Sequence, residues 1–119
     1  MAGRRTERLN EQLKRELAEL VRTAVRDPRV GLVTITGVVT TRDLGVARVH
    51  VHTLGSDAER ASTLEGLTAA APFLRTALGR VLSIRRVPEL RFQEDRSLEH
   101  ARRIEQVLSE VIPPDTPEE

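Results

Sequence analysis

Residues 46–54 alternate apolar and polar side chains so regularly that they are compatible with little except an amphipathic β-strand. The preceding segment, 32–41, is rich in Val, Ile and Thr and predicts a second strand, with Gly37 as a bulge that shifts its phase. The Asp-Leu-Gly sequence at 43–45 predicts a hairpin turn between them. The later strand then has an apolar and a polar face: Ala47, Val49 and Val51 against Arg48, His50 and His52.

Helical periodicity flanks this hairpin on both sides. Residues 6–26 carry an apolar stripe at helical spacing, and Thr6 is the predicted N-cap. The sequence Asp27–Pro28 ends this helix, because the residue before a proline avoids helical geometry. Ser56 and Glu59 have the spacing of a capping box and predict the start of a second helix.

The second helical pattern is interrupted at Pro72. Proline cannot donate a backbone hydrogen bond, its ring clashes with the carbonyl of Thr68, and it suits the first turn of a new helix. We therefore expect two helices, 57–71 and 72–81, that meet at a bend. Their predicted buried side chains are Ala58, Ala61, Leu64 and Leu67 in the first, and Phe73, Leu74, Ala77, Leu78 and Val81 in the second.

A last strand follows, with Leu90 and Phe92 facing inward, and then a helix from Ser97 to residue 111. The order α-β-β-α-α-β-α predicts a small α+β domain, in which helices cover one three-stranded sheet. We expect a single domain over 1–111, opened by a basic arm at 1–5. The acidic, Pro-rich tail at 112–119 is expected to be disordered.

Several classes of protein and site are disfavoured by the composition. The chain has no cysteine, which excludes disulfides and thiolate metal sites, and no run near the ~20 apolar residues of a membrane span. No apolar stretch follows its basic N-terminus, so we expect no secretory signal and a cytoplasmic location. His50 and His52 share a strand face, but zinc needs further ligands and His100 lies on another element. We expect no metal and no other cofactor.

No motif for catalysis is present in the sequence. There is no phosphate-binding Walker loop, no nucleophile elbow and no dinucleotide fingerprint. The neighbouring carboxylates Glu94 and Asp95 are interpreted as residues that help to start the final helix, rather than as an acid–base pair. The protein is therefore predicted not to be an enzyme.

Arginine dominates the basic residues. Of 19 lysines and arginines, only Lys14 is a lysine. Arginine suits bidentate contacts with phosphate, although GC-rich coding is an alternative explanation of the bias. The chain has no Trp or Tyr, and its two phenylalanines are predicted to lie in the core. A nucleic acid would then be held by its backbone and shape rather than by stacking.

The layout and several short sequences together resemble the bacterial ribosome-binding factor A family over about residues 5–111. The resemblance implies a type II KH-like fold with the last strand parallel beside the first. It also implies binding to the 30S subunit and assistance in late 16S rRNA maturation, often in the cold. The family's Ala-x-Gly bend, which replaces the usual Gly-x-x-Gly loop, falls on Ala70, Ala71 and Pro72. The matching strings are Asp27-Pro28-Arg29, Thr41-Arg42-Asp43-Leu44, Phe73-Leu74-Arg75, Leu78-Gly79, Arg86-Val87-Pro88-Glu89-Leu90 and Ser97-Leu98.

The candidate RNA contacts are basic side chains near the bend and at the N-terminus. The first group is Arg75, Arg80, Arg85 and Arg86, for which the alternative is a solvated face paired with Glu89 or Glu94. The second is a flexible arm with Arg4, Arg5 and Arg8, for which the alternative is an ordinary basic terminus. Arg42 is a further candidate at the hairpin tip, where Asp43 is assigned to turn formation.

The resulting hypothesis is a monomeric, non-catalytic assembly factor that binds the immature 30S subunit and its 16S rRNA. Three alternatives stay open. The chain could be a general KH-like RNA-binding module without ribosome specificity, a small α+β enzyme, or a protein-interaction domain.

Overall fold

The computed structural model describes residues 4–97. Helix α1 spans Arg4–Ala24, and its buried side chains recur every four residues at Leu13, Leu17 and Val21. The predicted N-cap at Thr6 is wrong, because the helix already includes Arg4 and Thr6 lies inside it. The helix ends shortly before Asp27–Pro28, as expected.

The predicted hairpin is confirmed. Strand β1 spans Val33–Thr40 and strand β2 spans Val46–Thr53, and the two pair antiparallel. The register shifts between Ile35 and Gly37, which confirms the predicted bulge. In the turn, the residue with positive φ is Leu44, at 60°, a conformation that is uncommon for residues other than glycine. Asp43 supports this turn by accepting a hydrogen bond from the N–H of Gly45 at 3.0 Å.

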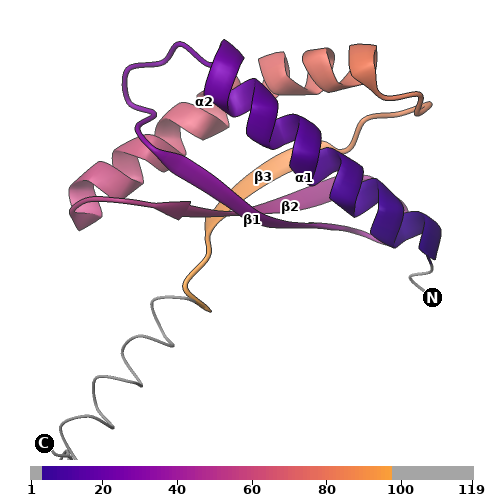
Figure 1. Ribbon diagram of the computed structural model, residues 1–119, viewed down its shortest axis with the longest axis horizontal. Helices are drawn as coiled ribbons and strands as arrows, with labels where there is room; N and C mark the ends of the chain where they lie inside the picture. Colours follow the sequence, from indigo (N-terminus) through magenta and orange to yellow (C-terminus); the bar gives the residue numbers. More distant parts are fainter. Residues whose placement is uncertain (1–3, 98–119) are drawn as a thin grey trace, which may run out of the picture.

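Helix α2 is a single helix, Asp57–Val81, with Pro72 inside it. The prediction of two separate helices is therefore wrong, although Figure 1 shows the axis of α2 changing direction along its length. A proline inside a helix removes one backbone hydrogen bond, which explains a bend without a break. The predicted capping box is confirmed: the N–H of Glu59 donates to the Ser56 hydroxyl, and the Glu59 carboxylate accepts from the N–H of Ser56.

Strand β3 spans Glu89–Glu94 and completes a three-stranded sheet in the order β1-β2-β3. It runs parallel to β2, from the pair Val46↔Glu89 to the pair Val51↔Glu94. The expectation that the last strand lies beside the first is therefore wrong, since β2 occupies the centre of the sheet. The α+β class is confirmed. The predicted final helix and the tail at 112–119 lie outside the described residues, apart from Ser97 itself.

Both helices pack on one side of the sheet (Figure 1). Within residues 4–97, neither helix has the combination of length and apolar content needed to cross a membrane. The core between the helices and the sheet is made of aliphatic side chains: Leu13, Leu17, Val21, Ile35, Val38, Ala47, Val49, Val51, Leu67, Leu74, Leu78 and Leu90.

Two assignments to the buried face of α2 are wrong in its first half. Ala58 and Ala61 are exposed, whereas Leu67 is buried. Nine residues make two and a half turns at about 3.6 residues per turn, so Ala58 and Leu67 point to opposite sides. Leu67 is buried as expected, and the other buried residues here are Thr63 and Gly66.

Two further assignments are wrong in the second half. Phe73 and Val81 are 50% and 54% exposed, while Leu74 and Leu78 are fully buried. Phe73 is one residue from Leu74, a rotation of about 100° around the helix, and cannot share its inward direction. Phe92 on β3 does pack against the core, as expected.

Candidate nucleic-acid interface

The segment from Pro72 to Pro88 contains four arginines and no acidic residue. Arg75 and Arg80 lie on the second half of α2, and Arg85 and Arg86 lie in the connection to β3. All four residues are exposed. Arg80 is in the last turn of the helix, where a positive charge interacts favourably with the helix dipole. The second half of the helix and its connection to β3 therefore present cationic side chains, and the segment that carries them contains no acidic residue.

The connection is held in place at its C-terminal end. The Arg75 side chain donates a hydrogen bond through an Nη atom to the carbonyl of Val87 at 2.7 Å, and Pro88 is fully buried. The N–H of Glu89 then donates to the carbonyl of Gly45 at 2.9 Å. Because β2 and β3 are parallel, their first residues lie at the same end of the sheet. The hairpin tip, 41–45, and the connection, 82–88, therefore meet there; we call these two segments the hairpin end.

The hairpin end brings Arg86 close to the tip that carries Arg42. Hydrogen bonds from the N–H of Gly45 and the hydroxyl of Thr41 lower the pKa of Asp43, and the positive charge of Arg86 acts in the same direction. Asp43 is thus engaged in turn formation, as expected. Arg42 and Arg86 come from distant parts of the sequence. The parallel pairing of β2 with β3 places them at the same end of the sheet.

The N-terminal end of α1 lies on the same side of the molecule as the hairpin end (Figure 1). The hydroxyl of Thr40, at the end of β1, donates to Asn10 Oδ1 of α1 at 2.9 Å. Arg4, Arg5 and Arg8 are exposed on the first two turns of this helix. The expectation of a flexible arm is wrong for these three residues, because they belong to a regular helix whose apolar stripe packs on the sheet. The part of the arm before Arg4 lies outside the described residues.

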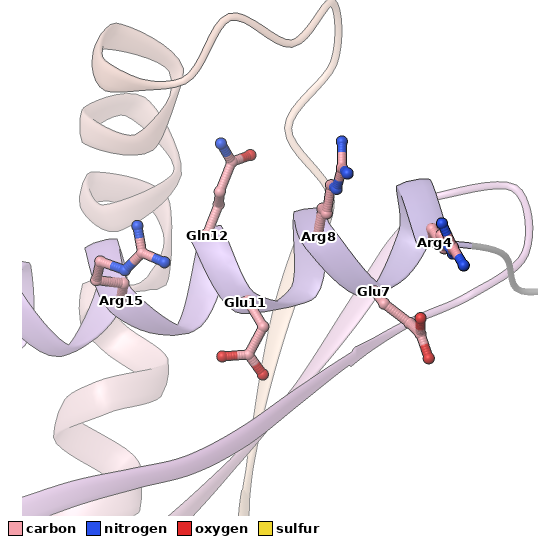
Figure 2. Close-up of a pocket in the computed structure, with 6 residues that line it drawn as sticks. All are labelled: Arg4, Glu7, Arg8, Glu11, Gln12 and Arg15. Atoms are coloured by element: carbon pink, nitrogen blue, oxygen red, sulfur yellow. The ribbon is translucent and has the colours of Figure 1, made fainter.

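A shallow hollow of about 420 Å³ lies along this part of α1. In Figure 2 the side chains of Arg8 and Gln12 point to one side of the helix, and those of Glu7 and Glu11 to the other. All the residues that line the hollow belong to one helix, so it does not enclose a ligand as a cleft between elements would. It is better described as part of a charged surface than as a small-molecule site.

The predicted bend residues lie apart from the hairpin end. Ala70 and Ala71 pack partly against the core, and Pro72 is exposed. At about 1.5 Å per residue, Pro72 is about 12 Å along the helix axis from Arg80. The structure thus brings Arg86 to the hairpin tip that carries Arg42 rather than to the bend.

The arginines of the segment 72–88 do not pair with the acids proposed as their alternative partners. Glu89 forms an ion pair with Arg91, with the Nε and Oε2 atoms 3.0 Å apart. Glu94 accepts hydrogen bonds from the hydroxyl and the N–H of Thr53 at 2.6 and 3.2 Å. Among the ion pairs of residues 4–97, none involves an arginine of this segment. The pairing alternative with Glu89 or Glu94 is therefore wrong.

The carboxylates at the end of β3 are engaged in structural hydrogen bonds. The Ser97 hydroxyl and N–H donate to Asp95 at 2.6 and 2.9 Å, and the Thr36 hydroxyl donates at 2.5 Å. The hydrogen bonds from Ser97 and Thr36 lower the pKa of Asp95 to about 2. A carboxylate that stays ionised in this way is a poor general acid or base near neutral pH. Its bond to the N–H of Ser97 agrees with a role at the start of the predicted final helix.

The two strand histidines do not gather a ligand set. His52 Nδ1 lies 3.9 Å from Glu94 Oε2, which is too long for a hydrogen bond. Across the described part of the chain, no three His, Asp or Glu side chains are grouped in a way that could hold a metal ion.

Sequence reasoning missed two features of the surface. Phe73 is predicted to lie in the core but is half exposed. Arg48 and Arg91 are paired in register on β2 and β3, and both are exposed on the face of the sheet away from the helices. The strict alternation of β2 located Arg48, but only the strand order puts Arg91 opposite it.

The fold and this surface define a small α+β domain with one strongly basic end and an arginine-rich connection, a combination typical of proteins that bind nucleic-acid backbones. Comparison with known proteins gives the family. The model of the family described as "Ribosome-binding factor A" matches residues 5–108. The chain belongs to the ribosome-binding factor A family.

Relatives agree in sequence and in structure. A ribosome-binding factor A from Desulforamulus reducens is 46% identical over 107 residues, which cover 90% of this chain and 89% of the relative. The crystal structure of ribosome-binding factor A from Thermus thermophilus is similar with a TM-score of 0.70 and 35% identity, over 77% of this chain and 97% of the other.

A third similar structure carries information about a partner. It is a homology model of the Thermus thermophilus protein fitted into a cryo-EM map of its complex with the 30S subunit. Its TM-score is 0.62 and its identity 36%, over 75% of this chain and 93% of the other.

Proposed function

We propose that this protein binds the immature 30S ribosomal subunit in the cytoplasm, as a monomer, and assists late maturation of its 16S rRNA without catalysing a reaction. The observation that carries the proposal is the run from Pro72 to Pro88, which has four arginines, no acid and no ion pair to a residue within 4–97. Membership of the ribosome-binding factor A family supports the choice of the 30S subunit as the polyanion.

The proposed interface is the hairpin end together with the last turn of α2 and the first turns of α1. Arg80, Arg85 and Arg86 contact phosphates directly, and Arg42 adds a contact from the hairpin tip. Arg75 has a different part, because its bond to the Val87 carbonyl orients the connection that carries two of the other arginines. Ala70, Ala71 and Pro72 shape the helix that presents this surface. Arg4, Arg5 and Arg8 extend the interface along α1.

Binding of this kind can assist maturation without a chemical step. A protein that has higher affinity for one conformation of rRNA than for another shifts the population towards the first. Such assistance matters most in the cold, where misfolded RNA conformations exchange slowly. The fixed arginines of the hairpin end supply the affinity, and the shape of the surface supplies the preference.

The experiment compares two triple variants on sucrose gradients with purified 30S subunits. Arg80→Gln, Arg85→Gln and Arg86→Gln together remove three proposed phosphate contacts. Arg22→Gln, Arg26→Gln and Arg96→Gln remove the same charge from exposed positions elsewhere. We expect the first variant to lose cosedimentation and the second to keep it. In equilibrium titrations, the slope of log affinity against log salt should fall by about one unit for each phosphate-binding arginine that is replaced.

Equal loss of cosedimentation in both triple variants would contradict the proposed interface, because it would show a response to net charge alone. Competition with bulk RNA tests the general RNA-binding module. Two competitors are compared: unrelated RNA and unlabelled 30S subunits. If unrelated RNA displaces the wild-type protein from bound 30S subunits as effectively as unlabelled subunits do, ribosome specificity is wrong.

A further inference from the structure

Phe73 is the exposed aromatic side chain of this protein. The chain has two phenylalanines and no Trp or Tyr. Phe92 packs against the core from β3, whereas Phe73 is 50% exposed. A large apolar ring at the surface of a small domain is informative when it lies beside a functional surface.

The orientation of Phe73 is fixed by its neighbours on α2. Leu74 and Leu78 are fully buried and anchor one face of the helix on the core. Phe73, Ala77 and Val81 follow at intervals of four residues and form a stripe beside that face. Phe73 and Val81 are each at least half exposed, so the two ends of the stripe are open to solvent.

The surroundings of the stripe are cationic. Thr76 and Arg80 lie three and seven residues after Phe73 and border the stripe on its outer side, and both are exposed. No acidic residue lies between Pro72 and Pro88, so this segment itself adds no negative charge to the border. A partner for this surface needs an apolar flat group together with negative charge. An unpaired RNA base with its phosphate meets both requirements, whereas an apolar protein helix meets only the first.

We propose that Phe73 stacks on an unpaired base of the bound RNA while Arg80 contacts a phosphate of the same strand. The proposal rests on the proposed function and adds to it a preference for a single-stranded segment. Phe73 and Arg80 are separated by about 10 Å along the helix axis, so a short stretch of one strand can reach both. Stacking tolerates any base, since every base has a π-face, and the site therefore favours unpaired over paired RNA without reading sequence.

The absence of native tryptophan permits a direct test. Phe73→Trp introduces one tryptophan into the chain, and Val39→Trp introduces one at a 53% exposed position on β1 as a matched control. Each variant is titrated with a single-stranded RNA oligonucleotide and with a fully paired duplex of the same length. We expect the single strand to quench the fluorescence of the Phe73→Trp variant strongly and the duplex to quench it little. The fluorescence of the Val39→Trp variant should change little with either RNA.

Two truncations keep the proposal testable if tryptophan disturbs the helix. Phe73→Ala removes the ring, and Phe73→Leu keeps an apolar side chain without a π-face. Both should weaken single-stranded RNA binding by at least about fivefold, the lower end of the range for loss of one stacked base. Circular dichroism checks that both variants are folded.

Each remaining outcome overturns the stacking proposal and leaves the proposed function to be judged by itself. If Phe73→Ala binds single-stranded RNA as the wild type does, while the Arg80, Arg85 and Arg86 triple variant is weak, the contact is electrostatic only. If Phe73→Leu retains full affinity, the ring has no stacking role. If Phe73→Ala impairs association with 30S subunits but not with naked RNA, the stripe contacts a ribosomal protein instead.

Discussion

The two halves of α2 share one helix but differ in charge and in what they contact. The half from Asp57 to Ala71 has three acids and one arginine, a net charge of −2. From Pro72 to the end of the connection at Pro88, the net charge is +4. Approach to a polyanion therefore favours one orientation, in which the second half leads. A single element can thus anchor the fold at one end and present a binding surface at the other.

The first half is fixed by close contact with the loop after α1. A Cβ atom added to Gly66 would lie only 2.7 Å from Val30 Cγ2 and 3.2 Å from Arg29 Cβ. The Thr63 hydroxyl donates to the carbonyl of Arg29 at 3.2 Å. The capping box at Ser56 completes this anchoring, since it satisfies backbone groups at the helix start.

The second half is fixed on one face only. Leu74 and Leu78 pack in the core, and Arg75 holds the connection through the Val87 carbonyl. A Cβ atom added to Gly79 would meet Val87 Cγ2 at 3.5 Å, an ordinary contact. Four predictions test this contrast, from the largest expected effect to the smallest.

The largest expected effect is a difference in the free energy of unfolding between variants of two neighbouring residues in the second half. Leu74→Ala should lower the free energy of unfolding by about 2–5 kcal/mol, because it creates a cavity in the core. Phe73→Ala should cost only about 1 kcal/mol, since half of the ring is already in water. Urea denaturation of both variants measures the difference. Equal losses would mean that Phe73 is buried in solution.

The same substitution should have opposite signs in the two halves. Gly66→Ala should lower the free energy of unfolding by about 1–3 kcal/mol through overpacking against Val30, less the gain from removing a helical glycine. Gly79→Ala should raise it by up to about 1 kcal/mol, because alanine favours the helix and finds room there. Thermal unfolding reports both values. A stable Gly66→Ala variant would show that the 27–30 loop is not packed tightly on α2.

A new negative charge should matter for binding in one half only. Thr76→Glu places a carboxylate beside Arg80, which then no longer contacts a phosphate. The slope of log affinity for RNA against log salt should therefore become shallower by about one unit. Ala61→Glu adds the same charge at an exposed position of the first half and should leave the slope unchanged. Titrations at several salt concentrations compare them. A matching change for Ala61→Glu would remove the functional contrast between the halves.

The smallest effect concerns acid stability of the loop that anchors the first half. Hydrogen bonds from the side chain and N–H of Arg29 lower the pKa of Asp27 from 3.8 to about 2. Because the folded state has the lower pKa, the stabilisation is present above about pH 4 and is lost as the pH falls towards 2. Asp27→Asn should therefore lower the melting temperature near neutral pH, and the difference from wild type should shrink towards pH 2. A difference independent of pH would exclude the ionised carboxylate as its source.

Local features of the fold could be predicted from sequence because their causes are local. The hairpin follows from the alternation of 46–54 and the turn at 43–45, and the capping box needs only Ser56 and Glu59. Continuity through Pro72 could not be predicted in this way. Packing of Leu67 and Leu74 on either side of the proline into one core keeps the helix together where local preference predicts a break.

The arrangement of the candidate site depended on tertiary structure. The sequence identified Arg42, Arg80, Arg85 and Arg86 as residues of interest, but not which of them meet, because that is decided by the order of the strands. The exposure of Phe73 was missed for a similar reason. From sequence alone, Phe73 and the adjacent Leu74 both fit a buried apolar stripe. Only the way the helix is rotated against the sheet buries Leu74 and leaves Phe73 exposed.

The hydrogen bond between Glu89 and Gly45 sets a condition on when this protein can act. It joins residues on opposite sides of a long crossover, and the parallel pair of β2 and β3 cannot form until that crossover is complete. The hairpin end is therefore not assembled in an N-terminal fragment that stops before β3. During synthesis, the chain gains this RNA-binding surface only after the residues through Glu94 have left the ribosome that makes it.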